Sequence, residues 1–195
     1  LGPRLAGAHR RGHFRRLKQL AKQAGVPLKS LLLTAHVYAL GRLTGHSDIT
    51  TGLVANGRPE TPGGEKTLGL FLNTVPFRHR LAAVPWLEGV RAVAAQEREL
   101  LPQRRFPLAE MQRRHGGELF ETAFNFIHFH VLKDAIADPA LHVLRERGFA
   151  RTNLPLAAEF SLDVNRNDAV TLRLSVHSDA IDDRQLATMA DIYRR

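Results

Sequence analysis

Two histidines separated by one residue provide the clearest metal-binding spacing in this chain of 195 residues. His128 and His130 lie in an aromatic run, 120–131, that we predict to be a strand, so both imidazoles would share one face. A structural zinc site needs four ligands, and a catalytic one needs three from the protein. The sequence places no third ligand convincingly near this pair. We therefore expect no metal here, and histidines that are hydrogen-bonded or line a channel.

A single asparagine interrupts the apolar face of a predicted strand at 70–81. Alternation puts Asn73 on the same face as Phe71, Val75 and Phe77, with Arg78 on the opposite face. An amide in such surroundings must have hydrogen-bond partners, because burying it without them is costly. Two interpretations remain open: Asn73 binds neighbouring backbone, or it is a polar group at the edge of a substrate tunnel.

The segment Asn56-Gly57-Arg58-Pro59 predicts a tight turn at the end of a strand. Within it, Arg58 could bind a carboxylate or clamp the loop of a partner, since its guanidinium offers paired donors. Gly63-Gly64 is not a phosphate-binding loop, because no Gly-Lys-Ser/Thr follows. Ser175, His177 and Asp179 are too close along the chain to form a believable catalytic triad.

The elements that must position these residues alternate between helix and strand. Three- and four-residue apolar spacing predicts helices, and alternation or β-branched runs predict strands. Asp182 is the expected N-cap of the last helix. This order predicts a mixed α/β fold with one central sheet. The expected helices are 10–24, 28–43, 85–101, 107–114 and one after Asp182, and the expected strands are 48–54, 70–81, 120–131, 154–164 and 170–176.

Composition excludes several classes of protein. There are no cysteines, so disulfides, thiolate metal sites and a cysteine nucleophile are ruled out. No apolar run approaches the ~18 residues that a membrane span needs, and no signal-peptide pattern is present. These features are typical of a cytoplasmic protein. The chain begins at Leu1, and we expect it to be a segment of a longer polypeptide.

Positive charge is concentrated at the N-terminal end. Residues 1–47 contain nine Arg and Lys residues and no acid, whereas the rest of the chain is balanced. This segment is either a solvated helix face or a docking patch for an acidic partner. Aromatic residues are scarce there, so a nucleic-acid platform is disfavoured and an acidic protein is favoured. The candidate docking residues are Arg11, Arg15, Arg16 and Lys18.

Four strings together resemble the condensation domains of non-ribosomal peptide synthetases. Residues 44–59 resemble the family's "TGQ-DI-VG…-GRP" stretch, and 68–78 its "GxFxNTxxxR" motif, which is the most specific match. Residues 103–111 resemble "HQxxPFEKL", with Arg104-Arg105 at or near the place of the leading His-Gln. Residues 119–126 resemble "PLFxxxFxxQ". The strings occur in the family's order and cover nearly the whole chain.

The resemblance implies a lobe like those of chloramphenicol acetyltransferase, with a mixed β-sheet packed against helices. Residues 1–195 would form the C-terminal subdomain, and the catalytic HHxxxDG string would lie upstream, in a second lobe. Such domains join an acyl thioester on one carrier protein to the amine of an aminoacyl group on another. The implied partners are the N-terminal lobe, the upstream and downstream peptidyl carrier proteins and an adjacent adenylation domain, with neither nucleic acid nor membrane.

The resemblance also assigns roles within the lobe. The lobe would bind no cofactor of its own and would meet the phosphopantetheine arms of the carriers in a tunnel between the two lobes. Asn73 would give polar support beside the tunnel, as would Arg58, Arg78, His128 and His130, and no catalytic residue would lie in this segment. The alternatives are an epimerisation or cyclisation variant, or a non-catalytic module that recruits a tailoring enzyme or carrier protein.

Overall fold

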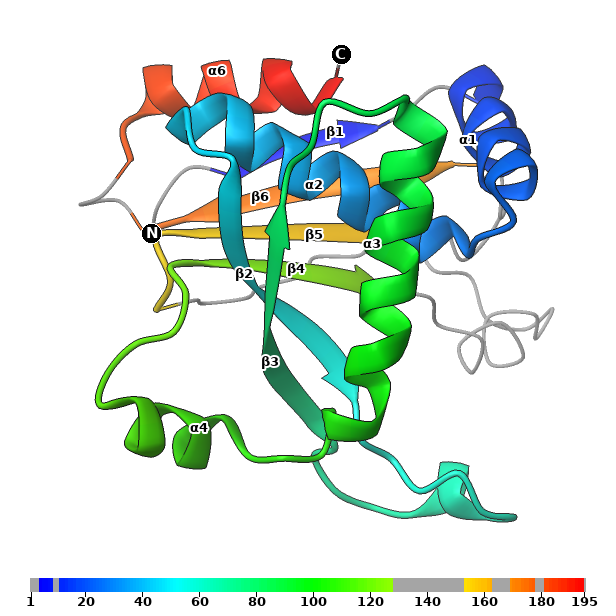
Figure 1. Cartoon of the computed structure of the whole chain (residues 1–195), viewed down its shortest axis with the longest axis vertical. Coiled ribbons are helices and arrows are strands. Elements are labelled where there is room, and N and C mark those ends of the chain that lie inside the picture. Colours follow the sequence, from blue (N-terminus) through cyan, green and yellow to red (C-terminus); the bar gives the residue numbers. More distant parts are fainter. Residues whose placement is uncertain (1–3, 9–10, 128–152, 163–168, 178–180, 195) are drawn as a thin grey trace, which may run out of the picture.

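The computed structural model describes residues 4–8, 11–127, 153–162, 169–177 and 181–194 (Figure 1). None of the described helices is long and apolar enough to cross a membrane. Two 3₁₀ turns, η1 (Gly64–Lys66) and η2 (Leu101–Gln103), join longer elements. Those elements are, in chain order, β1 (Arg4–Ala8), α1 (Arg11–Ala24), α2 (Leu28–Thr44), β2 (Asp48–Asn56), β3 (Leu72–Arg80), α3 (Trp86–Leu100), α4 (Leu108–His115), β4 (Thr122–Ile127), β5 (Leu156–Leu162), β6 (Val170–Val176) and α6 (Asp183–Arg194).

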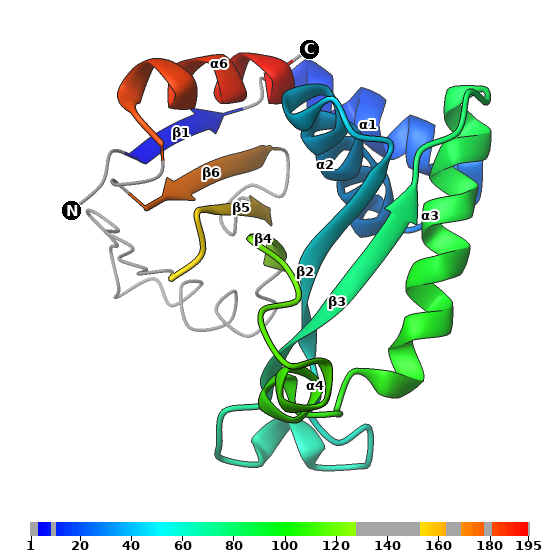
Figure 2. The same ribbon diagram turned by 60° about the vertical axis from the view of Figure 1, so that its left-hand side comes forward.

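One mixed sheet of six strands organises the chain, in the order β1-β6-β5-β4-β2-β3. The β2–β4 and β4–β5 pairs are parallel and the others antiparallel. The β2–β4 register joins Gly52 to Ala123 and Leu53 to Phe124. Beyond this short contact the β2–β3 hairpin turns across the direction of the other strands, as Figures 1 and 2 show. The hairpin therefore carries the 57–71 loop away from α1, α2 and α6, toward the segment that joins α3 to α4.

Gly52 is required at this crossing because a larger residue would not fit. A Cβ built there would lie 2.5 Å from a ring carbon of Phe120 and 2.7 Å from the Thr74 side chain. Contacts that short are repulsive in a close-packed interior. The glycine thus lets Phe120 pack directly on β2, next to the point where the hairpin joins the rest of the sheet.

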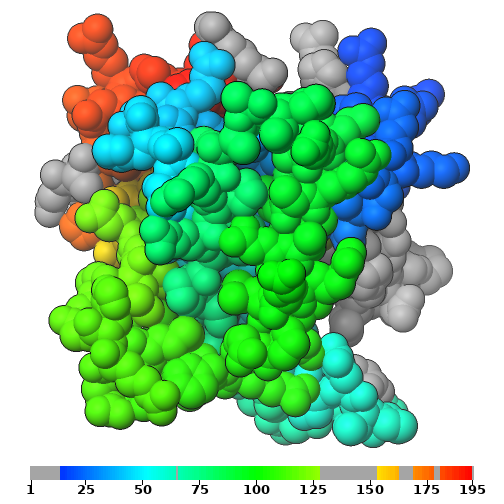
Figure 3. Space-filling view, viewed as in Figure 1, coloured from blue at the N-terminus to red at the C-terminus, as the bar shows by residue number. Residues whose placement is uncertain are grey.

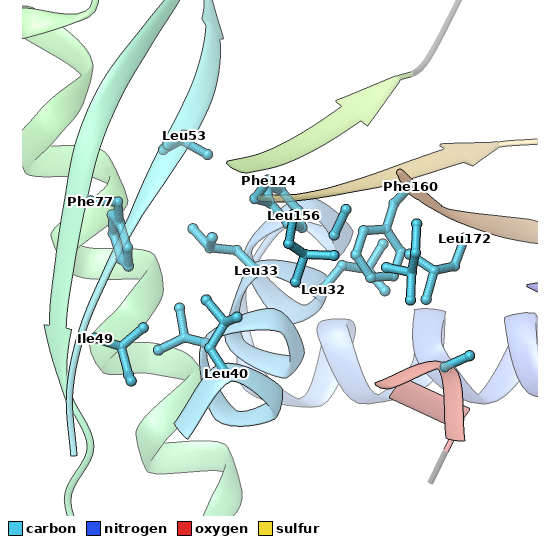
Figure 4. Close-up of a cluster of buried hydrophobic side chains, with 14 of the residues drawn as sticks. Leu32, Leu33, Leu40, Ile49, Leu53, Phe77, Phe124, Leu156, Phe160 and Leu172 are labelled. Atoms are coloured by element: carbon cyan, nitrogen blue, oxygen red, sulfur yellow. The ribbon is translucent and has the colours of Figure 1, made fainter. Parts of the chain in front are cut away.

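Helix α2 lies at the centre of the core, between the sheet and the neighbouring helices. Ten of its 17 residues are buried, as expected from its apolar sequence. Its leucines pack against Phe77 of β3, Phe124 of β4 and Phe160 of β5 in one cluster (Figure 4). Full burial of each such side chain contributes about 1.5–3 kcal/mol. Packing against α2 therefore contributes strongly to the stability of the described fold.

Among the buried polar side chains of α2, His36 and Ser30 bind partners on other elements. His36 is fully buried; its Nδ1 lies 2.6 Å from the Tyr193 hydroxyl of α6 and its Nε2 lies 3.0 Å from Thr51 Oγ1 of β2. Thr122 of β4 donates to Thr51 Oγ1 at 2.9 Å. These contacts link α6, α2, β2 and β4 through one hydrogen-bonded chain. Burial lowers the pKa of His36 to about 3, so the imidazole is neutral in the folded protein.

A second buried group joins α2 to α3. Ser30 donates to Glu97 Oε2 at 2.6 Å, and Lys29 Nζ lies 2.9 Å from Glu97 Oε1. Glu97 is almost completely buried, whereas Lys29 is partly exposed. Because both oxygens of the carboxylate have partners, its burial does not leave an uncompensated charge.

Within the described residues, the elements expected from the sequence are confirmed with small shifts of their ends, whereas the strand ends expected at 128–131 and 163–164 lie outside those residues. The α1 helix ends at Ala24 before Gly25, and Asp182 caps α6 by accepting from the Gln185 N–H at 2.7 Å. The strand expected at 70–81 begins only at Leu72, which pairs with Asn56, the last residue of β2. The short β1 strand was not predicted; it pairs with β6 along the sheet edge.

Two expected core positions are wrong. The apolar spacing of the predicted helix 85–101 places Trp86 and Leu101 inward, but they are 40% and 42% exposed. Trp86 is the first residue of α3 and packs edge-on against Tyr38, with ring centroids 5.1 Å apart. Leu101 lies beyond the helix, in η2. Apolar spacing identifies the helix correctly but does not apply at its ends, where the chain leaves the core.

We predict that His36 lowers the free energy of unfolding as pH falls, in a pH range where the carboxylates are still ionised. The imidazole of the unfolded chain, with its ordinary pKa near 6.5, takes up a proton as pH falls, whereas the buried imidazole of the folded protein stays neutral. The contribution of His36 to stability is therefore fully present above that pKa and is lost as pH falls below it. This group alone should remove about 2 kcal/mol of unfolding free energy between about pH 7 and pH 5.

Urea unfolding across this range compares the wild-type chain with His36→Gln, which cannot titrate. His115→Gln, on exposed α4, is the matched control. We expect a shallower pH dependence for His36→Gln only. Identical slopes for all three proteins would show that His36 is not the group responsible.

Candidate functional site

Asn73 lies at the far end of the β2–β3 hairpin and binds backbone of another segment. Its Nδ2 donates to the carbonyls of Arg104 at 3.0 Å and Phe106 at 2.7 Å. Its Oδ1 accepts from the Leu108 N–H at 3.4 Å, at the start of α4. Asn73 shares a face with buried Val75 and Phe77, as predicted, but is itself only half-buried. Of the two interpretations, the structure shows the bonds to neighbouring backbone directly.

Arg58 organises the 57–71 loop at the same end of the hairpin. Its Nη1 donates to the carbonyls of Thr67 and Gly64, the latter at 3.3 Å. Its guanidinium carbon lies 4.6 Å from the centroid of the Phe71 ring, a cation–π contact. Its backbone N–H donates to Asn56 Oδ1 at 3.0 Å, which fixes the turn after β2. The loop that Arg58 clamps in this structure is therefore that of its own chain.

Arg104 and Arg105 complete this arrangement and were not identified as site residues from the sequence. Arg105 donates to the carbonyls of Gly57 at 3.0 Å and Arg58 at 3.1 Å. Arg104 lies 2.7 Å from Glu60, with its own side chain 16% exposed. The signal for them was present, because this Arg-Arg pair lies where the resemblance expected His-Gln. Together with Arg58 and Asn73 they form what we call the hairpin brace.

Several exposed apolar side chains lie at the same end of the hairpin as the brace. Leu68 and Leu70 are 96% and 86% exposed, and Leu72 and Phe106 are also exposed. Apolar residues clustered at an ordered end of a lobe are typical of a surface that another protein segment covers.

Arg78 lies toward the opposite end of the hairpin, away from the brace. It donates two hydrogen bonds to Asp48, at 2.9 and 2.7 Å, and Arg80 approaches the same carboxylate at 3.3 Å. The hydrogen bond from Arg78 is the main reason that the pKa of Asp48 is lowered to about 2. The structure therefore brings Arg58 and Asn73 together but not Arg78, which pairs the start of β2 with the end of β3.

The basic residues of α1 are arranged as the sequence predicts. Phe14, Ala21 and Ala24 are buried against the lobe, and Arg15, Arg16 and Lys18 are exposed on the outer surface. Lys18 lies over the Phe14 ring, 4.4 Å from its centroid. Arg11 is the first residue of the helix. In Figure 3 the blue surface of α1 projects at the edge of the molecule.

The two histidines with metal-like spacing lie outside the described residues, so the expectation about them stays a prediction. Within the described part of the chain, no group of three or more His, Asp or Glu side chains is arranged to hold a metal ion.

Comparison with known families decides the classification. The family model described as "Condensation domain" matches residues 9–183, which include the hairpin, the brace and the central core. The chain belongs to the condensation-domain family. The four sequence strings fall within the matched range, and the "GxFxNTxxxR" string covers the 57–71 loop end and β3. The resemblance inferred from the sequence is confirmed.

Curated relatives are large synthetases. The chain is 40% identical over 147 residues to the AMB antimetabolite synthetase AmbE of Pseudomonas aeruginosa, covering 75% of the chain and 7% of that protein. It is 29% identical over 149 residues to the chondramide synthase of Chondromyces crocatus, covering 72% and 4%. The chain thus spans less than a tenth of these relatives.

Solved structures confirm the fold, which is that of the chloramphenicol acetyltransferase-like condensation domains. The condensation domain of the monacolin K polyketide synthase MokA matches with a TM-score of 0.80 at 19% identity, over 98% of this chain and 45% of that one. The X-domain from teicoplanin biosynthesis matches with a TM-score of 0.82 at 21% identity, over 98% and 45%. A complex of that X-domain with OxyB also matches.

We predict that Asn73 stabilises the lobe through the 104–108 segment. Asn73→Ala loses two donated hydrogen bonds and should lower the unfolding free energy by about 1–3 kcal/mol. Asn73→Asp should cost more than Asn73→Ala, because a carboxylate oxygen would face the carbonyls of Arg104 and Phe106. Urea unfolding measures both changes, and Asn153→Ala, at an exposed asparagine, is the control. An Asn73→Ala variant as stable as Asn153→Ala would contradict this role.

Proposed function

We propose that this chain is the C-terminal subdomain of a condensation domain in a non-ribosomal peptide synthetase. In this proposal it forms one wall of a tunnel in which an acyl or peptidyl thioester on one carrier meets an aminoacyl group on another. The observation that carries the proposal is the match of the condensation family to residues 9–183, with four motif strings in order. The chain also aligns with less than half of a solved condensation domain.

The chemistry is acyl transfer from sulfur to nitrogen. The amine nitrogen attacks the thioester carbonyl, the C–N bond forms, the C–S bond breaks, and the donor carrier is released with a free thiol. A base must take the proton that the amine loses, and the family resemblance places that base in the HHxxxDG string of the other lobe. Holding two tethered reactants in line can lower the activation barrier by about 7–11 kcal/mol. This lobe contributes to that positioning.

The hairpin brace has a defined part in this proposal. Asn73 and Arg58 act as positioning residues that fix the 57–71 and 104–108 segments at the tunnel border, without transferring a proton. Their many bonds to backbone carbonyls support such a role, because catalytic geometry depends on supports that do not move. Arg78 supports the opposite end of the same hairpin through Asp48.

Two assays test the enzymatic proposal. The 195-residue chain alone, mixed with loaded donor and acceptor carriers, should form no dipeptidyl product above a no-protein background, because no HHxxxDG string is present. The same chain fused behind an N-terminal lobe with an intact HHxxxDG string should restore product formation. Product from the chain alone would contradict the proposal that the catalytic base lies in the other lobe. A folded fusion that remains inactive would contradict the condensation proposal itself.

A second candidate function is recruitment without catalysis. The X-domain that matches this fold has been solved in complex with OxyB, so a condensation-type fold can serve as a protein-binding module. For this chain, a decayed HHxxxDG string in the partner lobe would favour recruitment, and an intact one would favour condensation.

We also predict that the exposed cations of α1 speed the approach of carrier proteins, which are commonly acidic. Arg15→Glu combined with Arg16→Glu should lower the association rate at low salt. The difference should shrink as salt rises, since exposed charges are screened beyond about 8–10 Å at physiological ionic strength. Stopped-flow measurements with upstream and downstream carriers check this. Unchanged rates at low salt with both carriers would mean that α1 is only a solvated face.

A further inference from the structure

A groove of about 1130 Å³ opens between α1, α2 and α6, on the helical side of the lobe and away from the hairpin brace. It reaches down to Leu32 and Phe160, both of which belong to the buried core. Leu17 of α1 and Ile192 of α6 form opposite walls. Small residues of α2, Ala35 and Ala39, leave the space between them open.

The rim of this groove is positively charged. Arg16, Arg42 and Arg194 lie around it with a single acid, Asp191. Arg194 approaches Asp191 at 3.6 Å, whereas Arg16 and Arg42 are exposed and form no ion pair with any described residue. Helices α1 and α2, which supply Arg16 and Arg42, contain no Asp or Glu. An apolar floor therefore lies beneath two arginines that no described residue neutralises.

From these features we infer that the groove binds an acidic amphipathic helix of a partner protein. A helix has a diameter of roughly 10 Å and rises 1.5 Å per residue, so the groove volume corresponds to about two to three turns. That volume exceeds the ~300–1,000 Å³ typical of small-molecule pockets. A helix laid between helices reaches such a floor through side chains spaced three and four residues apart.

Charge complementarity selects the acidic partner. Leucines of the bound helix would contact Leu17, Ala35 and Ile192, while its flanking carboxylates would pair with Arg16 and Arg42. A basic helix would place like charges side by side at the rim, which is unfavourable. The inference requires neither carrier proteins nor condensation chemistry, so it stands or falls separately from the proposed function.

The only tryptophan of the chain reports directly on this groove. Trp86 forms part of its wall, is 40% exposed and packs against Tyr38. The probe is a synthetic helical peptide of about 14 residues, with leucines on one face and glutamates on the other. Titration at low salt should change the Trp86 emission saturably. The same peptide with lysine in place of each glutamate should bind at least about tenfold more weakly.

Variants separate groove binding from general electrostatics. Arg16→Glu combined with Arg42→Glu should weaken binding by about tenfold or more at low salt. Arg98→Glu combined with Arg184→Glu makes the same charge change at exposed positions outside the groove, and affinity should stay within about twofold. Ala187→Phe fills the groove from exposed α6 and should weaken binding at unchanged circular dichroism.

Three results would overturn the inference: no saturable change in emission, equal loss of affinity in the two double variants, or equal binding of the lysine peptide. Normal binding by a folded Ala187→Phe variant would also place the peptide elsewhere.

Discussion

Burial of helix α2 is the constraint on which the rest of the fold depends. The polar side chains that are buried with the helix must find their hydrogen-bond partners inside the protein. His36 therefore reaches both α6 and β2, and Ser30 and Lys29 reach Glu97 on α3. These bonds have direction, whereas apolar packing alone does not. They fix α6 and α3 against α2, and the bond to Tyr193 thereby fixes the α6 wall of the groove.

The other end of the molecule is organised by backbone bonding. At the hairpin brace, three arginines and an asparagine bind mainly carbonyl oxygens of loops, and little apolar burial is involved. Loops without regular pairing need such donors, because their carbonyls lack the partners of a helix or strand. The lobe thus has a core that is held by packing and a projecting end that is held by side-chain donors. The family match includes both regions.

The sequence predicted most of the elements because their signals are local. Periodicity located α1, α2 and α3. Gly25 and Gly45 directly follow α1 and α2, and Asp182 caps α6 as predicted. The motif strings identified the family and hence the fold. Pairings over long distances were beyond reach: nothing in residues 4–8 shows that they join β6, and nothing in Arg104 or Arg105 shows that they contact the 57–71 loop.

The edge strand β3 has one consequence for how this lobe can associate. It ends the sheet, and Pro76 lies within it, opposite Gly52. Proline is tolerated there because its missing N–H falls on the side without a neighbouring strand. That gap, followed by the charges of Arg78 and Arg80, interrupts the row of donors that a foreign strand would need. The long, partly apolar hairpin is therefore protected against edge-to-edge aggregation with other chains.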